Sequence, residues 1–471
     1  MNIARSSAIH VAALAALGAA LVLPGIGRTV ITRQQELRVL LASRHMAQGG
    51  SWLVPQFKGE PRLRKPPLMY WLVAASFKAA GSVRSLAAAR LPSAAAGILL
   101  VLLTYAGGSV LVGRRRAFLG AFAGAVSVLF IRHARLAETD MTLSLLTASA
   151  ILSGCRALLP GRRRAGWWAL AGLCAGLGFM TKGPAAPGLF LAAVVPFALF
   201  SPDTRRSLAS PSALAFIPAL LALALPWYLT VMREPGISEA VGGELTRTFV
   251  EGGHAKPFHY YLWQLPWLML PFGPLVPFGL WLAWKRRGHR GMRFLLVWAL
   301  TSLLALSLIN SKQAHYAVLL LPPASLLAGL ILYRPLARYP RGRRVTAALY
   351  ASVAVLAAGA AWAYSASWGS RERAESLVPE FAEAARPRLA AAAGVVLTGP
   401  RAPLVEFYLD GDARYAASPA AAWETAGPGE AVIVALHEKG LDADVGIPAE
   451  PELDLRKADL RCALYLKPAA D

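Results

Sequence analysis

The sequence predicts an all-α polytopic membrane protein with a small α/β domain at its C-terminal end. Of the 471 residues, 56% are hydrophobic and only 16% are charged, which is more apolar surface than a soluble core needs. Apolar stretches near the ~20 residues that cross a bilayer recur through the first 367 residues. After Ser367 the chain instead alternates short apolar runs with turn residues, as small sheet-containing domains do.

We therefore expect a transmembrane domain at 1–367, with an outer loop at 31–90, and an extracytoplasmic domain at 368–471. Lys and Arg number 38 and acids 9 up to Ser367, against 11 and 17 after it. The net charge of +23 thus lies in the membrane part, in short clusters between apolar runs. This pattern indicates a topology signal and contact with membrane lipids rather than a nucleic-acid partner.

The basic clusters predict the topology, because short loops rich in Lys and Arg stay in the cytoplasm. The clusters bracket the apolar runs two at a time and lie at 114–116, 162–164, 205–206, 285–287 and 341–344. The resulting spans, about eleven in number, are predicted at 8–30, 91–112, 117–132, 141–158, 166–181, 185–201, 211–231, 262–284, 293–309, 316–333 and 345–366. We expect them to lie in the cytoplasmic (inner) membrane of a bacterium, with the C-terminal domain outside.

One apolar stretch, 66–81, is left over. It is short, begins with two prolines and carries Lys78, so we expect a helix at the outer interface rather than a full span. With this topology, eight of the nine acids of the membrane part face outward, and only Asp203 faces inward. Glu138 and Asp140 open a span, where a carboxylate is costly unless it is used. Any chemistry is therefore predicted at the outer face.

The first outer loop holds the most informative motif. Residues 34–47 have helical periodicity and predict an amphipathic surface helix that carries Glu36 and Arg38. Lys65 precedes two prolines, which restrict its backbone to an extended turn. A cation held in this way suits a phosphate group.

These motifs resemble the C-type, polyprenyl-phosphate-dependent glycosyltransferases, and most closely the protein O-mannosyltransferase and aminoarabinose (lipid A) transferase group. The Lys65-Pro-Pro-Leu string followed by Tyr70-Trp71 carries the resemblance, as does Gly50-Ser-Trp52 before it. Further strings follow in family order at 90–93, 133–141, 180–184, 225–228, 244–249, 257–261, 265–267, 311–316 and 321–323. Together they cover roughly residues 30–330.

The chain departs from the family at one position. The family's first acidic pair falls on Gln35-Glu36, and an amide cannot serve as the proton acceptor that the family's aspartate provides. The resemblance therefore implies that Glu36, Asp140 or Glu138 takes the catalytic role.

The resemblance implies an inverting single displacement, in which a carboxylate takes a proton from the acceptor and the polyprenyl phosphate leaves. The implied donor-binding residues are Lys65, Arg38, Arg247, Lys182, Lys312, His315 and Tyr316. No cofactor is certain; a divalent cation held by Glu36 and Asp140 is left open. The expected partners are a polyprenyl-phosphate sugar donor and membrane lipids. Lipid A, another glycan, a lipid and a protein all stay open as acceptors.

Two alternatives to an enzyme are open. Because Gln35 replaces the aspartate, the chain could be an inactive relative that binds a polyprenyl lipid or a partner protein. A transporter of lipid-linked sugars is the second alternative, but such a protein would place paired charges in the middle of its spans. The predicted spans of this chain hold almost no acids, and no internal repeat is found.

Overall fold

The computed structural model describes residues 3–31, 33–63, 65–159, 164–233, 256–338, 342–371, 377–409, 413–437, 446–457 and 460–468. The chain forms two compact units. The first comprises 1–24, 63–72 and 90–362, and the second comprises 25–62, 73–89 and 363–471. The predicted domain boundary at 367/368 stays a prediction.

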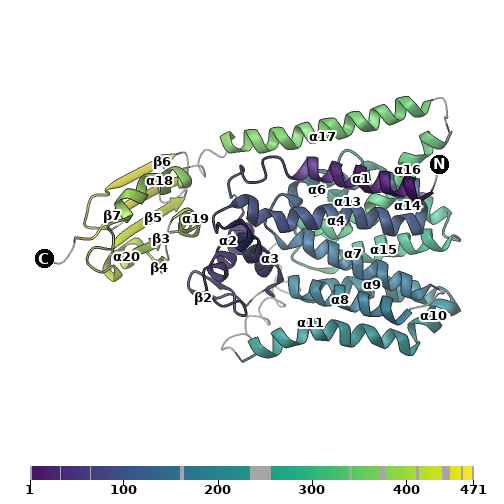
Figure 1. Ribbon diagram of the computed structural model, residues 1–471, viewed down its shortest axis with the longest axis horizontal. Coiled ribbons are helices and arrows are strands. Elements are labelled where there is room, and N and C mark those ends of the chain that lie inside the picture. Colours follow the sequence, from purple (N-terminus) through teal and green to yellow (C-terminus); the bar gives the residue numbers. More distant parts are fainter. Residues whose placement is uncertain are drawn as a thin grey trace. The chain divides into compact units, whose positions relative to one another are not determined.

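The first unit is a bundle of helices that lie side by side (Figure 1). Its elements are α1 (Ile3–Val22), most of α4 (Leu86–Val112), α5 (Arg114–Ala125), α6 (Val128–Ala134), α7 (Thr139–Leu158), α8 (Arg164–Lys182), α9 (Ala185–Leu199), α10 (Pro202–Leu208), η1 (Pro211–Ala215), α11 (Phe216–Val231), α13 (Tyr260–Leu268), η3 (Gly273–Leu275), α14 (Val276–Lys285), α15 (Arg290–Leu308), η4 (Ala314–Leu320), α16 (Leu321–Arg338) and most of α17 (Arg343–Arg371).

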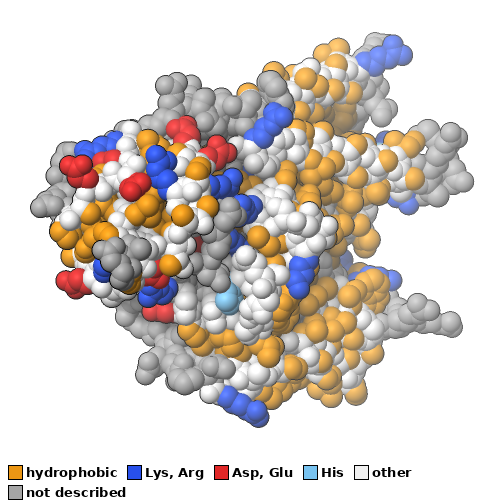
Figure 2. Space-filling view, turned by 60° about the vertical axis from the view of Figure 1, so that its left-hand side comes forward, with side chains coloured by type: hydrophobic (Ala, Val, Ile, Leu, Met, Phe, Trp, Pro, Cys, Tyr) orange, Lys and Arg blue, Asp and Glu red, His pale blue; other side chains and the backbone are white. Residues whose placement is uncertain are grey.

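Five helical segments among the described residues are long and apolar enough to cross a membrane, and the bent pair α5–α6 makes a sixth if it is one span. Large apolar side chains stay exposed along these helices, such as Leu99 on α4 and Leu229 on α11, at 52% and 57%. Figure 2 shows hydrophobic side chains, drawn in orange, over much of the visible surface of the helices. Apolar side chains that face outward suit a lipid environment, where burial against protein is not needed.

Several predicted spans are broken helices. The span predicted at 117–132 is two helices, α5 and α6, bent by 62°, because Ser127 caps α6 by accepting a hydrogen bond from the Phe130 N–H. The span predicted at 262–284 is divided among α13, η3 and α14, where prolines remove backbone donors. The first helix ends at Val22, eight residues before the predicted end of its span. The predicted count of about eleven spans therefore stays a prediction.

The outer-loop helices form where the sequence predicts them. α2 (Gln34–Ala47) matches the predicted helix at 34–47, but most of its side chains are buried in the second unit rather than lying on a surface. α3 (Leu68–Ala80) has 13 residues, about 20 Å at 1.5 Å per residue, which is too short to cross ~30 Å of hydrocarbon. Between them, β1 (Gln56–Phe57) and β2 (Glu60–Pro61) pair as a small hairpin.

The second unit also contains the predicted C-terminal sheet. Its strands are β3 (Val395–Thr398), β4 (Arg414–Ala416), β5 (Ala431–His437), β6 (Leu453–Lys457) and β7 (Leu460–Leu466), in the order β4-β3-β5-β7-β6. β3 pairs in parallel with β4 and β5, whereas β7 pairs antiparallel with β5 and β6. The helices α18 (Leu377–Leu389), α19 (Ala402–Tyr408) and α20 (Pro419–Thr425) pack on this sheet. Consecutive residues of β5 are buried, so both faces of the central strand are covered.

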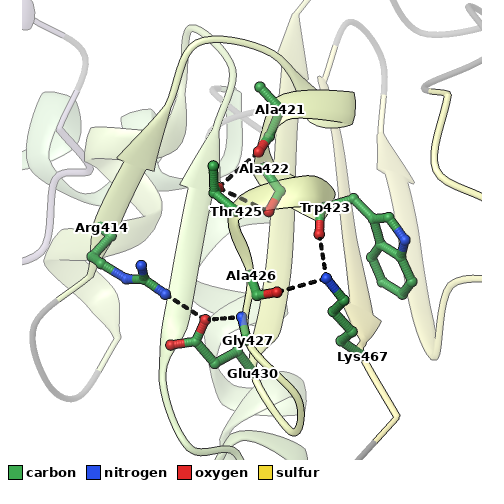
Figure 3. A network of polar contacts seen from close by, with 9 residues as sticks. All are labelled: Arg414, Ala421, Ala422, Trp423, Thr425, Ala426, Gly427, Glu430 and Lys467. Atoms are coloured by element: carbon green, nitrogen blue, oxygen red, sulfur yellow. Dashed lines mark hydrogen bonds and ion pairs between the residues drawn. The ribbon is translucent and has the colours of Figure 1, made fainter.

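A polar network fixes the turn before β5 (Figure 3). The Glu430 carboxylate accepts hydrogen bonds from the Gly427 N–H and from Arg414, while Lys467 Nζ donates to the carbonyls of Trp423 and Ala426 at 2.9 and 2.6 Å. The Gly427 N–H and Arg414 hold the pKa of Glu430 below its usual value. These contacts hold the turn in one conformation, so Glu430 and Lys467 need no catalytic role to explain their positions.

Two buried arginines close the carboxyl ends of helices. In the first unit, Arg135 donates to the carbonyls of Val22 and Pro24 at the end of α1, both at 2.8 Å. In the second unit, Arg44 of α2 donates to three carbonyls at the end of α19, among them Glu406 O at 2.9 Å and Leu409 O at 3.1 Å. The last carbonyls of a helix lack partners within it and carry partial negative charge, so a guanidinium stabilises them.

Candidate functional site

A buried ion pair lies at the start of α7 in the first unit. Lys182 Nζ donates to Asp140 Oδ1 at 3.0 Å, and the two side chains are 18% and 4% exposed. The other carboxylate oxygen, Asp140 Oδ2, is buried and has no hydrogen-bond partner among the described residues. A buried charge is costly unless it is paired, so Lys182 offsets Asp140 but leaves one acceptor oxygen unused.

Local structure explains why these two side chains meet. Asp140 lies in the first turn of α7, where a carboxylate interacts favourably with the positive end of the helix. Lys182 is the last residue of α8, which ends because Gly183 has a φ of +62° and donates to Phe179 O at 2.8 Å. Glycine adopts this left-handed conformation at little cost and commonly terminates helices.

Two histidines and a second carboxylate lie next to this pair. His133 Nδ1 is 3.6 Å from Glu138 Oε2, and both side chains are buried. The ring centroids of His133 and His315 are 6.2 Å apart. Glu138 is held at its backbone, where its carbonyl accepts from Ser93 Oγ at 3.1 Å.

The segment before α16 supplies the opposite wall. The ammonium of Lys182 lies 4.3 Å from the centre of the Tyr316 ring, and the Tyr316 and His315 rings meet edge to face at 4.7 Å. Ser144 of α7 donates to Val318 O at 2.8 Å, which fixes η4 against α7. Lys312 is buried, and its ammonium donates to Lys256 O at 3.1 Å.

The predicted site residues divide into three groups. The first unit brings together Asp140, Glu138, Lys182, His315 and Tyr316, and the positive charges of Lys182 and Lys65 act on the Asp140 carboxylate. Glu36 and Arg38 belong to the second unit, where Glu36 is fully buried. Arg247 lies outside the described residues.

The sequence reasoning missed the His133–Glu138 contact. The two residues are five apart across the end of α6, a spacing that neither a regular helix nor a strand makes adjacent. The predicted spans leave a break at 133–140, and the structure has one between α6 and α7, but hydrophobicity does not show which side chains meet across it. His133 alone therefore looked like an ordinary histidine.

The described residues contain no group of three or more His, Cys, Asp or Glu side chains arranged to hold a metal ion. At Asp140, the ammonium of Lys182 occupies the position beside one carboxylate oxygen where a cation would bind. The cation predicted for Glu36 and Asp140 therefore stays a prediction.

The chain matches known proteins in this region. The family model described as dolichyl-phosphate-mannose-protein mannosyltransferase matches residues 64–229, which include Lys65, Glu138, Asp140 and Lys182. An undecaprenyl phosphate-alpha-4-amino-4-deoxy-L-arabinose arabinosyl transferase of Pseudomonas aeruginosa is 33% identical over 306 residues, covering 62% of this chain and 54% of the relative. The relative of the same name from Serratia proteamaculans is 31% identical over 309 residues, covering 63% of this chain and 54% of the relative.

Solved structures share the fold over a longer stretch. ArnT from Cupriavidus metallidurans bound to undecaprenyl phosphate aligns with a TM-score of 0.79 at 16% identity and covers 98% of both chains. The archaeal oligosaccharyltransferase AglB from Archaeoglobus fulgidus aligns with a TM-score of 0.55 at 13% identity, covering 92% of this chain and 69% of that one.

The fold and the sequence matches thus make the chain similar to the polyprenyl-phosphate-dependent glycosyltransferases. Within them, the chain resembles the protein mannosyltransferase and aminoarabinose transferase group, as its motifs predict. The chain spans about half the length of the curated relatives it matches.

Proposed function

We propose that this chain is a membrane glycosyltransferase that moves a sugar from a polyprenyl-phosphate lipid to an acceptor at the outer face of the cytoplasmic membrane. The observation that carries the proposal is the buried Asp140 carboxylate, with one oxygen bonded to Lys182 and the other without a hydrogen-bond partner among the described residues. A buried acceptor oxygen of this kind suits a group that receives a proton. The matches to polyprenyl-phosphate transferases give the class of donor.

In the proposed reaction, Asp140 Oδ2 accepts the proton of the acceptor group. The deprotonated atom attacks the anomeric carbon, and the bond from that carbon to the lipid phosphate breaks with inversion. Lys182 and Lys65, which both act on Asp140, stabilise the negative charge that develops on the departing phosphate. Tyr316 orients Lys182 through the cation–π contact.

Glu138 with His133 is the second candidate for the base, because the geometry is that of a carboxylate beside an imidazole. Glu36 is the third, since it follows the position at which the family has its aspartate. Substituting each carboxylate by its amide separates the three, because loss of the base removes a factor of about 10²–10⁴ in rate.

A gene deletion followed by mass spectrometry of lipids and glycans tests the function. We expect the deletion strain to lack one sugar on one class of molecule, and the wild-type gene to restore it. Asp140→Asn should fail to restore it at equal protein level. Asp203→Asn is the matched control, since Asp203 is exposed on α10 and lies on the predicted cytoplasmic side.

An unchanged glycan and lipid profile in the deletion strain would favour a relative that only binds a lipid. Full restoration by Asp140→Asn would reject Asp140 as the base and leave Glu138 and Glu36 to be tested in the same way. Loss of activity on chelation, with recovery on adding a divalent cation, would support the metal that the sequence leaves open.

A further inference from the structure

A basic cavity of about 600 Å³ lies in the first unit between two turns that each carry a predicted cytoplasmic cluster of basic residues. One wall is the turn between α4 and α5, residues 109–113, with Arg116. The other wall is the turn between α14 and α15, with Lys285, Arg286 and His289. Arg116 of the cluster at 114–116 and Lys285 and Arg286 of the cluster at 285–287 therefore line one site, as expected if both clusters lie on the same side of the membrane.

Backbone contacts build this cavity. A Cβ on Gly291 would lie 2.0 Å from Leu111 O, so the first turn of α15 packs directly on the end of α4. Gly113 has a φ of +89° where the chain reverses from α4 into α5. The distance between the two basic turns is thus set by packed backbone rather than by side chains alone.

The cavity is positively charged. No Asp or Glu lines it, and no described carboxylate forms an ion pair with Arg116, Lys285 or Arg286. Arg116 is held by a hydrogen bond from Nη1 to Val112 O at 3.0 Å. Lys285 is held by its ammonium lying 4.2 Å from the centre of the Trp281 ring. Fixed cations without a counter-charge attract an anion.

Neighbouring aromatic residues indicate the depth of this site. Trp281 and Trp284 are 51% and 54% exposed. The guanidinium carbon of Arg287 lies 4.5 Å from the centre of the Trp284 ring. Exposed tryptophans paired with basic residues are typical of the membrane–water interface. The cavity thus lies at the level of lipid headgroups.

An apolar cavity adjoins the basic one. The guanidinium of Arg116 lies 5.3 Å from the centre of the Tyr333 ring. Tyr333 also lines a cavity of about 400 Å³ with Phe118, Phe122 and Leu336. Arg116 of the basic cavity and Tyr333 of the largely apolar one are therefore in contact, and a charged cavity beside an apolar one suits the two parts of a phospholipid.

We propose that this is a binding site for an anionic phospholipid of the inner leaflet. Its phosphate is held by Arg116, Lys285 and Arg286, and an acyl chain occupies the apolar cavity beside Tyr333. The site is separate from the Asp140 cluster and does not depend on the proposed transfer reaction.

Native mass spectrometry of the full chain in detergent tests the site, with phosphatidylglycerol, phosphatidylethanolamine and undecaprenyl phosphate added separately at equal concentration. The wild type should retain phosphatidylglycerol. Lys285→Gln/Arg286→Gln should bind it roughly 30-fold more weakly, from the loss of two basic residues near the headgroup. Arg205→Gln/Arg206→Gln removes the same charge from exposed positions on α10 and should leave binding unchanged.

Arg116→Gln is the second variant, and it keeps Arg114 and Arg115 as the topology signal of the same turn. It should weaken binding of phosphatidylglycerol even if the double variant fails to insert. Equal loss in the Arg205/Arg206 control would show non-specific attraction and overturn the site. Equal retention of phosphatidylethanolamine, preferential retention of undecaprenyl phosphate, or displacement by millimolar inorganic phosphate would each reject an anionic phospholipid as the ligand.

Discussion

Replacing Lys182 by methionine should destabilise the helical unit and abolish transfer, and a second substitution separates the two effects. At the observed 3.0 Å, the attraction between two unit charges is about 5.5 kcal/mol at an effective dielectric constant of ~20. Removing one partner leaves the Asp140 carboxylate buried and unpaired, which costs about 3–5 kcal/mol. A loss of that size lowers the melting temperature by roughly 6–10 °C, at about 2 °C per kcal/mol.

The double variant Asp140→Asn/Lys182→Met should recover most of that stability, because no uncompensated charge remains. It should not recover transfer, since the proposed base is gone. Intrinsic fluorescence during heating in detergent measures the melting temperature, and the restoration of the missing sugar in the deletion strain measures activity. Lys256→Met, at an exposed position, is the control.

A single variant that melts within about 1 °C of the wild type would contradict the estimate, since a broken buried pair is not neutral. A double variant as unstable as the single one would mean that Lys182 acts through Tyr316 or another contact instead of through Asp140. Restored transfer in the double variant would reject both residues as part of the reaction.

Four further predictions concern the rest of the chain. Arg44→Met should lower the stability of the second unit by about 2–5 kcal/mol, because three helix-end carbonyls lose a charged donor; limited proteolysis of the full chain measures this, and unchanged cleavage would contradict it. Because the pKa of Glu430 is depressed, its ionised carboxylate stabilises the fold at pH values above the ordinary pKa of 4.5, and this stabilisation is lost as the pH falls through the folded-state pKa. The melting temperature of Glu430→Gln should therefore fall less between pH 6 and pH 3 than that of the wild type. A reporter active only outside the cytoplasm should be active when fused at Ser370 and silent at Gly161, and the reverse pair would reject the topology. Gln35→Asp should raise transfer activity if the family's first acid acts in this chain, and an unchanged rate would place the base elsewhere.

Helices could be predicted from the sequence because apolar periodicity and basic clusters are local signals. The predicted span at 141–158 and the observed α7 differ by only two residues, at the start of the helix. The region of the predicted span at 117–132 is a bent pair of helices, with a bend of 62° where the hydroxyl of Ser127 caps α6. Single serines are frequent in membrane helices, so hydropathy alone does not reveal which one breaks the helix.

The site could be predicted in part. Asp140 and Lys182 were singled out as separate candidates, but their 3.0 Å contact joins positions 42 residues apart, and only the packing of α7 on α8 brings them together. Gly178 of α8 lies between the neighbouring helices: a Cβ there would lie 3.7 Å from the Leu146 Cβ of α7 and 2.4 Å from the Ala186 Cβ of α9. Pairing across such distances leaves no pattern in a single sequence.

If Asp140 is the base, as we propose, the buried cluster provides a reaction centre in a chain with Gln35. The lysines, histidines and carboxylates of the cluster come from four segments of the first unit: Lys65, His133 with Glu138 and Asp140, Lys182, and His315. Lys182 donates to Asp140 Oδ1 at 3.0 Å. In the proposed donor the phosphate is a diester with one negative charge, and its charge increases as the bond to the anomeric carbon breaks, so the ammonium stabilises it most as it departs. In the proposed reaction Lys182 would stabilise the departing phosphate while Asp140 Oδ2, which is not bonded to Lys182, accepts the proton. A proton acceptor would then lie beside the cation of the leaving group, and the proposed proton transfer would not require Gln35.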